Sequence, residues 1–342
     1  MEQPFSNSKN DVRIAVIGGG TGSFTMLSGL KHHSKRLAAI VSMADDGGST
    51  GVLRDELGAL PPGDVRKCLV ALSDTPKIRD LFEYRFEAGT LSGHSFGNIL
   101  LTALEKVTGS FAEAVSTASE ILRINGMVIP ATLDDVRLKM EWADESVILQ
   151  GEGVIDANYF SHDPRNANLS LVPNPKPNPL AITAIEDADI VVITPGDLYT
   201  SLGPLLCIDG IGQALNNTKA LKVYISNLVT KDGQTAGFTV SDHAAEIERF
   251  AGFNFIDYVI YNDQKPIEAV AERYEEEKAY LVHIDTDVLQ KKHYKAVGGE
   301  FLGDIAEKGK NDTIKVTRGF IRHDSDAIAR TVMEIYNSVR KK

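Results

Sequence analysis

Two short apolar segments near the start of the chain each run into a glycine-rich segment, and this pattern constrains the fold most. Residues 12–17 are apolar and mostly β-branched, and they lead directly into the segment 18–22, GGGTG. Residues 23–32 carry apolar side chains at helical spacing, and a second apolar run, 37–43, ends in the segment 45–51, DDGGSTG. This order predicts a βαβ unit with parallel strands. Both glycine-rich loops then lie at the carboxyl edge of the sheet, where open α/β sheets bind ligands.

The remaining chain continues this alternation, with one exception. Further strands are predicted at 189–194, 221–227 and 256–261, and helices at 77–88, 96–107, 111–123, 241–250, 267–277 and 325–338. Between them, residues 127–172 contain several strand-like runs, and a proline-rich, extended connection follows at 173–179. We therefore predict a Rossmann-like α/β fold, a mostly parallel sheet flanked by helices. It forms a single domain over residues 11–342, with a small β-rich insertion at about 127–172 and a disordered tail at 1–10.

Composition narrows the class of protein. The net charge is −11, from 36 basic and 47 acidic residues, which argues against broad binding to nucleic acid. The two cysteines, Cys68 and Cys207, form no CxxC pair, so a disulfide framework or a cysteine-rich zinc site is excluded. The N-terminal residues lack the apolar core of a signal peptide, and no run reaches the roughly 20 apolar residues of a membrane span. We expect a cytoplasmic protein without a membrane span.

The first glycine-rich loop predicts an anion site. Glycines after a buried strand allow close approach to a ligand, and the next helix offers free N–H groups at its N-terminus. The spacing is not the dinucleotide fingerprint, because Ser23 stands where that pattern has its third small residue, and no Gly-Lys-Ser/Thr follows as in a P-loop. The alternative is a structural turn without a ligand. The candidate ligand-binding residues here are Gly18, Gly19, Gly20, Thr21, Gly22 and Ser23.

Acidic and basic residues follow the second strand. Asp45 and Asp46 are candidates to hold ribose hydroxyls or, as a metal site, Mg²⁺, which prefers oxygen ligands. The alternative is a helix cap. Asp64 lies in a turn before a predicted helix, and Arg66 could clamp a phosphate in bidentate fashion, unless it lies on a solvated helix face.

A loop of small residues at 92–98 adds a histidine and an amide. His94 is a candidate acid/base or phosphate donor, and Asn98 a candidate for binding a hydroxyl or an amide; the alternative is a loop histidine with a structural hydrogen bond. The candidate catalytic residues are therefore Asp45, Asp64 and His94.

A second loop, 194–204, follows another buried strand and offers hydroxyls and backbone amides to an anion. Its candidate ligand-binding residues are Pro195, Gly196, Asp197, Thr200 and Ser201. Asn227 and Asn262 both end predicted strands, where ligand-facing residues are expected, and Arg322 precedes the last helix.

Several of these segments together resemble one family. They are IAVIGGGTGSFTMLSGLK, VSMADDGGSTGVLRDELGALPPGDVRKCLVALS, SGHSFGNILL, ADIVVITPGDLYTSLGPLL, YISNLVTKDGQTAGFTVSDH and IRHD. Across roughly residues 12–325 the chain resembles the YvcK-type, CofD-like family. This resemblance implies a Rossmann-like fold with a smaller inserted region and one of two activities.

In the CofD branch, the resemblance implies a Mg²⁺-dependent transferase that moves a 2-phospholactyl group from a guanosine-linked donor to a deazaflavin alcohol. In the YvcK branch, it implies a UDP-sugar-binding factor for gluconeogenic growth, cell shape and cell-wall (peptidoglycan) synthesis, with cell-wall synthesis proteins as partners. There, Arg322 and a tyrosine of the preceding helix, Tyr274, are associated with the UDP-sugar, and Ser325 occupies the position of a phosphorylatable hydroxyl.

The segments GTLSGHSFGN, PGDLYTSLGPLL and IRHD favour the YvcK branch. Our first hypothesis is therefore a regulatory binder of a nucleotide sugar of the UDP-N-acetylglucosamine class, with a homodimer as the default assembly. The second is the CofD-type transferase, with Mg²⁺ as cofactor. A third, an NAD(P)-dependent oxidoreductase, is disfavoured by the incomplete fingerprint at Ser23.

Overall fold

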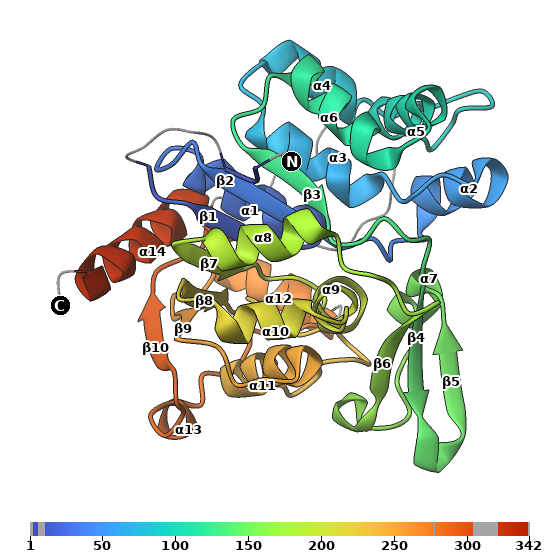
Figure 1. Cartoon of the computed structure of the whole chain (residues 1–342). Coiled ribbons are helices and arrows are strands. Elements are labelled where there is room, and N and C mark those ends of the chain that lie inside the picture. Colours follow the sequence, from blue (N-terminus) through green and yellow to red (C-terminus); the bar gives the residue numbers. More distant parts are fainter. Residues whose placement is uncertain (1–2, 6–10, 277, 304–320, 341–342) are drawn as a thin grey trace.

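The computed structural model describes residues 3–5, 11–276, 278–303 and 321–340. In this part of the chain, seven parallel strands form the main sheet in the order β10-β9-β8-β7-β1-β2-β3 (Figure 1). These strands are β1 (Ile14–Gly18), β2 (Leu37–Val41), β3 (Met127–Pro130), β7 (Ile190–Ile193), β8 (Leu221–Ile225), β9 (Tyr258–Asn262) and β10 (Lys295–Gly299). The predicted Rossmann-like α/β class is confirmed.

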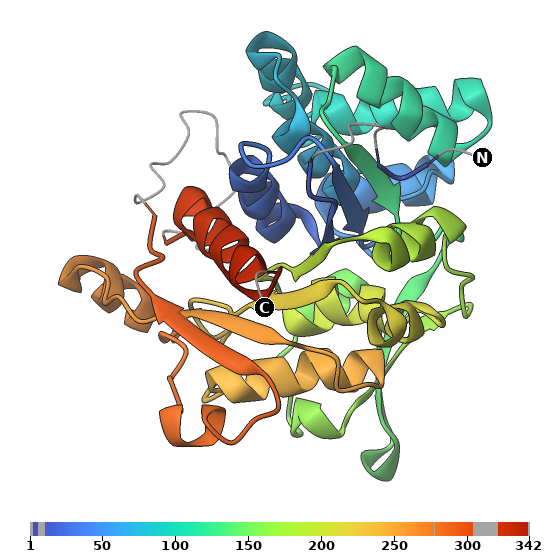
Figure 2. The same cartoon turned by 60° about the vertical axis from the view of Figure 1, so that its left-hand side comes forward.

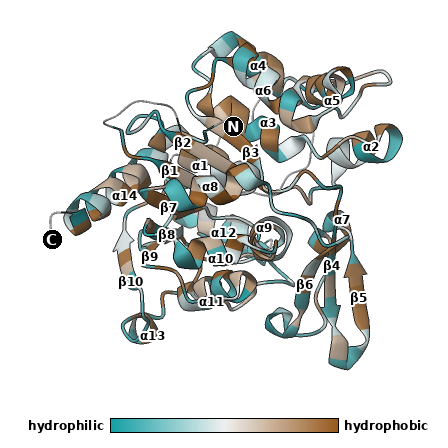
Figure 3. Ribbon diagram, in the orientation of Figure 1, coloured by the Kyte–Doolittle hydropathy of each residue, from teal (hydrophilic) through white to brown (hydrophobic). Residues whose placement is uncertain are grey.

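Strand β1 shows why the sheet needs helices on both faces. All five of its residues are buried. Ile14 and Val16 belong to one hydrophobic cluster, and Ala15 and Ile17 belong to the other, because successive side chains of a strand point to opposite faces. A strand without a polar face is stable only between two covering layers. In Figure 3 the central strands are accordingly mostly hydrophobic.

The two covering layers come from different parts of the chain. One cluster includes buried residues of α1 (Gly20–Leu30), α3 (Gly63–Leu72), α6 (Phe111–Leu122) and α14 (Ser325–Arg340). The other includes residues of α8 (Pro179–Asp187), α9 (Gly203–Leu206), α10 (Ile211–Asn217) and α11 (Val240–Ala251). Helix α14 lies against α1, and Figure 2 shows the two helices side by side. They are the last and the first helix along the described part of the chain. The remaining helices are α2 (Gly48–Leu57), α4 (Pro76–Glu83), α5 (Phe96–Thr108), α7 (Glu152–Asp156), α12 (Glu268–Glu276) and α13 (Thr286–Leu289).

A separate antiparallel sheet, in the order β5-β4-β6, extends from the main body (Figure 1). It consists of β4 (Arg137–Trp142), β5 (Val147–Gln150) and β6 (Asn168–Val172). Burial alternates along β4, so Leu138, Met140 and Trp142 pack into the same cluster that covers the main sheet. The predicted β-rich insertion therefore exists, but its predicted start was wrong. Residues 127–130 form β3, the edge strand of the main sheet, because their backbone pairs with β2.

Other predictions differ in detail. The segment DDGGSTG was interpreted as a loop, yet helix α2 already begins at Gly48. Strand β10 was not predicted. Of the predicted disordered tail, the structure describes only residues 3–5, and Phe5 is buried in the core; the rest of that tail lies outside the described residues. Within the described residues, no helix combines the length and apolarity required to cross a membrane.

Candidate functional site

The candidate site lies at the carboxyl edge of the main sheet, around the end of β1. Strand β1 has β2 on one side and β7 on the other. The chain adds β2 and β3 on one side of β1, and the later strands β7 to β10 on the opposite side. At such a switch point the loops after the two neighbouring strands separate and leave a ligand-binding crevice. The two predicted loops, after β1 and β7, both reach this point, as does the segment after β2.

The glycines after β1 are required by close packing. Helix α1 begins at Gly20, so the predicted loop is already the first helical turn. A Cβ atom at Gly22 would overlap the carbonyl oxygen of Pro195, and one at Gly19 would lie 3.0 Å from both Asp64 Oδ2 and Ser201 Cβ. The three segments thus approach one another more closely than any side chain would permit. The helix start, with its free N–H groups, is placed between them.

Helix α3 supplies a cation beside this turn. Lys67 Nζ lies 3.5 Å from Thr21 Oγ1 and 3.7 Å from Asp64 Oδ1. The Lys67 side chain is 37% exposed, so its ammonium group remains open to solvent and to a ligand. An ammonium group next to a helix N-terminus is a suitable environment for a phosphate.

Three carboxyl groups, those of Asp45, Asp64 and Glu152, lie near one another beside this turn. Asp45 accepts a hydrogen bond from the Gly47 amide at 3.0 Å, and its Oδ2 would lie 2.8 Å from a Cβ atom at Gly63, the first residue of α3. Burial, followed by repulsion from Asp64, raises the pKa of Asp45 to about 6. Burial, followed by repulsion from Asp45, raises the pKa of Glu152 to about 8. At neutral pH Glu152 therefore holds a proton, which a cation bound beside these carboxyl groups would displace.

The carboxylates suit Mg²⁺ by chemistry, since hard cations prefer oxygen ligands. Within the described residues, however, no three His, Cys, Asp or Glu side chains are already close enough to form a metal site. The predicted metal pair, Asp45 and Asp46, also diverges. Asp46 turns to the insertion, where it accepts hydrogen bonds from the amides of Glu152 and Gly153 and pairs with Arg137 at 3.3 Å. Asp64, rather than Asp46, is the carboxylate beside Asp45.

A chain of hydrogen bonds joins three other predicted residues. Arg66 Nε donates to Asn98 Oδ1 at 2.9 Å, and Asn98 Nδ2 donates to Ser49 Oγ at 3.3 Å. Ser49 Oγ lies 2.9 Å from His94 Nδ1. Because Arg66 can only donate, the Asn98 amide is oriented with Oδ1 toward Arg66 and Nδ2 toward Ser49, and the direction of the Ser49–His94 bond depends on the His94 tautomer. Arg66 is 7% exposed, so the alternative of a solvated helix face is wrong, and Asn98 holds its guanidinium group.

The second predicted loop is a π-helical turn, η3 (Leu198–Leu202), which continues into α9. Such turns are rare and are frequently found at functional sites. Its Ser201 is the residue that meets Gly19. Thr200 Oγ1 is buried, with no partner among the described residues. Asp197 lies 3.8 Å from Lys231, and Asn227 exchanges two hydrogen bonds with the Gly196 backbone, which joins the ends of β7 and β8.

Tyr274, Arg322 and Ser325, the residues that the family resemblance implies, all follow β8 in the chain. The Tyr274 hydroxyl accepts a hydrogen bond at 2.8 Å from the amide of Ile321, next to Arg322, which is exposed. His323 Nε2 lies 3.1 Å from the Ser226 carbonyl oxygen, so this segment is anchored at the end of β8. Burial lowers the pKa of His323 to about 4. Ser325 is the first residue of α14.

Asn262 does not join the site through its side chain. Its amide group donates to the Gln264 carbonyl at 2.7 Å and accepts from the Phe301 amide at 2.9 Å. Conversely, three residues of the site were not predicted. Lys67 directly follows the candidate Arg66 in the sequence. Ser49 lies within the DDGGSTG motif and could have been found there. Glu152 is contributed by the insertion, and no sequence motif marks it.

The model of the family described as 2-phospho-L-lactate transferase CofD matches residues 14–302. A gluconeogenesis factor of Bacillus subtilis is 39% identical, with 94% of this chain and 98% of the relative covered. A gluconeogenesis factor of Halalkalibacterium halodurans is 37% identical, with 94% and 95% covered.

A solved structure is similar over the same range. A crystal structure of a UPF0052 family member from Bacillus halodurans superposes with a TM-score of 0.84 at 36% sequence identity, covering 95% of this chain and 100% of that one. The predicted family is therefore confirmed: this chain belongs to the CofD family and, within it, to the relatives named gluconeogenesis factors.

Proposed function

We propose that this protein is a regulatory factor that binds a nucleotide sugar of the UDP-N-acetylglucosamine class and serves gluconeogenic growth, cell shape and cell-wall synthesis. The names of its relatives support the link to gluconeogenesis. The observation that carries the proposal is the approach of Lys67 and Ser201 to the glycine turn at the start of α1. This arrangement combines backbone amides and one ammonium group at a switch point, which suits a diphosphate.

The carboxyl groups would then bind the sugar or ribose. A protonated carboxyl group donates one hydrogen bond and accepts others, whereas a carboxylate only accepts. Since Glu152 has a pKa of about 8, it can supply both at neutral pH. Arg322 would add a second cation from the segment anchored at Ser226. Reversible binding then requires no bond to break, so we expect the ligand to be recovered unchanged.

The test is calorimetric titration with UDP-N-acetylglucosamine, with GDP and NADH in parallel, each with and without Mg²⁺. We expect only the UDP-sugar to bind tightly, and chromatography of the mixture to recover it intact. Replacing Arg322 by Ala should weaken binding by about 2–4 kcal/mol if it makes a charge-assisted bond to the diphosphate. Arg330→Ala is the matched control, because Arg330 is an exposed arginine within α14. Unchanged affinity in Arg322→Ala would remove that residue from the site.

A second candidate is the CofD-type transfer, which the family model and the carboxyl cluster favour. The deazaflavin alcohol oxygen would form a bond to the phosphorus of the 2-phospholactyl group, and the bond from that phosphorus to the guanosine monophosphate leaving group would break. The alcohol proton would pass to a general base, for which His94 is the candidate. Mg²⁺, held by Asp45 and Asp64, would neutralise phosphate charge.

Product analysis separates the two candidates. Incubation with a deazaflavin alcohol, the guanosine-linked donor and Mg²⁺ should give no phospholactyl product if the protein is only a binder. Formation of that product, and its loss in Asp45→Asn, would place the transferase first.

A further inference from the structure

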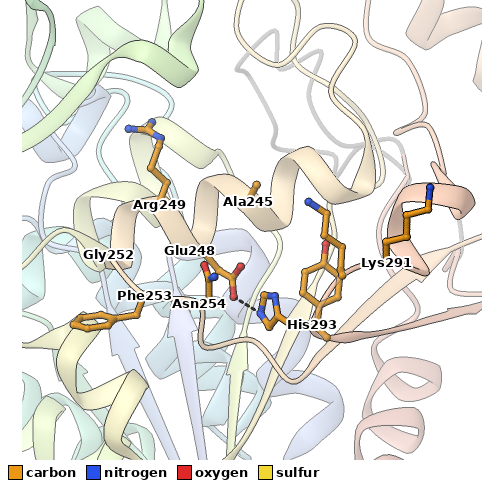
Figure 4. A pocket seen from close by; sticks show the side chains of 10 residues that line it. Ala245, Glu248, Arg249, Gly252, Phe253, Asn254, Lys291 and His293 are labelled. Carbon is orange, nitrogen blue, oxygen red and sulfur yellow. Dashed lines mark hydrogen bonds and ion pairs between the residues drawn. The ribbon is translucent and has the colours of Figure 1, made fainter.

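Two buried charged groups show how this protein compensates a charge that leaves water. Arg54 is buried, and its guanidinium group pairs with Asp135 and donates to the Val136 carbonyl oxygen at 2.6 Å. In the pocket at the end of α11, the buried carboxylate of Glu248 lies 2.9 Å from His293 Nε2 (Figure 4). A buried charge is costly unless an opposite charge or several hydrogen bonds compensate it. A buried charge without such compensation is therefore a place to expect a ligand.

Arg66 of α3 lacks this compensation. It is 7% exposed, and its Nε donates to Asn98 Oδ1 at 2.9 Å. Within the described residues, its Nη1 and Nη2 form no hydrogen bond, and no carboxylate lies within ion-pair distance of them. The unpartnered Arg54 Nε is sealed from solvent, whereas neither Nη atom of Arg66 is. The free end of this buried guanidinium group is therefore accessible to a ligand.

A second arginine faces Arg66. Arg85, which follows α4, pairs in antiparallel fashion with Ser95, the N-cap residue of α5. The Arg66 side chain packs on the same turn, because a Cβ atom at Gly97 would lie only 2.6 Å from Arg66 Cδ. Arg85 donates from Nη1 to the Gly93 carbonyl oxygen and has no ion-pair partner among the described residues. Burial, followed by repulsion from Arg85, lowers the pKa of Arg66. The fold therefore brings two like charges together beside the first turn of α5.

This arginine pair, Arg66 and Arg85, borders the candidate nucleotide-sugar site. Arg66 and Lys67 are consecutive residues of α3, so their side chains point about 100° apart. The carboxyl groups of Asp45 and Asp64 attract both of these cations, and Lys67 Nζ lies 3.7 Å from Asp64 Oδ1. The site thus has two cation positions next to one carboxyl cluster, Lys67 at the glycine turn and the arginine pair beside α5. A ligand that fills both positions has to carry two separated anionic groups.

We propose that the ligand of this site is an acidic nucleotide sugar, whose diphosphate binds at Lys67 and whose sugar carries a carboxylate that binds between Arg66 and Arg85. The planar guanidinium group matches a carboxylate with two parallel hydrogen bonds. The carboxyl cluster then binds the hydroxyl groups of the sugar that lie between the two anionic groups. This inference rests on the proposed nucleotide-sugar function and narrows it, because a neutral sugar leaves both guanidinium groups without a counter-ion.

The test is calorimetric titration of the full chain with UDP-N-acetylglucosamine and with UDP-N-acetylmuramic acid, which adds a carboxylate on a lactyl ether to the same sugar. We expect the acid to bind at least about tenfold more tightly, and this advantage to shrink with added salt. Equal or weaker binding of the acid would overturn this inference and leave the nucleotide-sugar function intact. Absence of binding by either nucleotide sugar would overturn both.

Two variants locate the carboxylate. In Arg85→Gln the advantage of the acid over the neutral sugar should fall to about twofold or less. Arg66→Lys keeps the charge but removes the planar fork, so the advantage should fall about three- to tenfold. Arg123→Gln is the matched control and should keep the full advantage, since this exposed arginine ends α6 just before β3, at the amino edge of the sheet. Circular dichroism confirms that each variant is folded. A full advantage of the acid in Arg85→Gln, or an equal loss of affinity for both ligands, would overturn the inference.

Discussion

Asp46 Oδ1 accepts a hydrogen bond at 2.8 Å from the backbone amide of Gly153, a residue 107 positions later in the chain. Asp46 Oδ2 accepts a second amide bond from Glu152 at 3.1 Å and lies 3.3 Å from Arg137. This one carboxylate joins the segment after β2 to helix α7 and strand β4. It therefore holds the insertion, and with it the Glu152 side chain, against the carboxyl edge of the main sheet.

Replacing Asp46 by Asn should loosen this attachment. The substitution removes the negative charge that faces Arg137 and the two amides, so we expect a loss of about 2 kcal/mol in the free energy of unfolding, measured by urea denaturation. Asp55→Asn is the matched control, because Asp55 pairs with the same Arg137 at 2.6 Å but is 70% exposed, and it should change stability by less than about 1 kcal/mol. Equal effects of the two variants would contradict the assigned role of Asp46.

Replacing Gly22 by Ala should disrupt the meeting of the two loops. A Cβ atom there would overlap the Pro195 carbonyl oxygen, which belongs to a backbone that cannot move freely. We expect a loss of about 3 kcal/mol in thermal or urea denaturation. Gly47→Ala is the control, since the nearest atoms to its Cβ would lie 3.5 Å away and its φ is −85°. If Gly22→Ala is as stable as wild type, the close approach described here is wrong.

Glu152 should make stability fall as pH rises. Its pKa is raised in the folded protein to about 8 from 4.5, so between these values the folded state binds more protons than the unfolded state. Unfolding free energy then decreases with increasing pH over this window. Glu152→Gln removes the titration, so the variant should gain stability relative to wild type from pH 5 to pH 8, by on the order of 4 kcal/mol at the upper end. A difference in melting temperature that stays constant with pH would refute the raised pKa.

The hydrogen bond between Ser49 and His94 depends on the tautomer of His94. We expect the Ser49 hydroxyl, which accepts from Asn98, to donate its one proton to His94 Nδ1, so that the neutral ring carries its proton on Nε2. Nitrogen-15 NMR of the imidazole ring distinguishes the two tautomers. In Asn98→Ala the chain is broken at its centre, so the preference should weaken while the fold is retained. Predominance of the Nδ1–H form in the wild-type protein would contradict the direction assigned to the chain.

Much of the fold could be predicted because its signals are local. Apolar runs such as residues 14–18 must be buried. The helical spacing of apolar residues that follows them, and the next apolar run, predict a βαβ unit. The glycines after β1 likewise marked the right place. The start of the insertion could not be found in this way, because whether residues 127–130 pair with β2 or with the insertion depends on backbone partners far away in the sequence.

The same distinction applies to the candidate site. The sequence by itself determined the family, the parallel α/β fold and the glycine-rich segments, since these follow from contiguous motifs and local periodicity. Only the tertiary structure decided that Asp64 rather than Asp46 lies beside Asp45, that Arg66 is buried against Asn98, and that Glu152 enters from the insertion. Side-chain direction and burial result from packing between segments separated by tens of residues, and no local pattern encodes them.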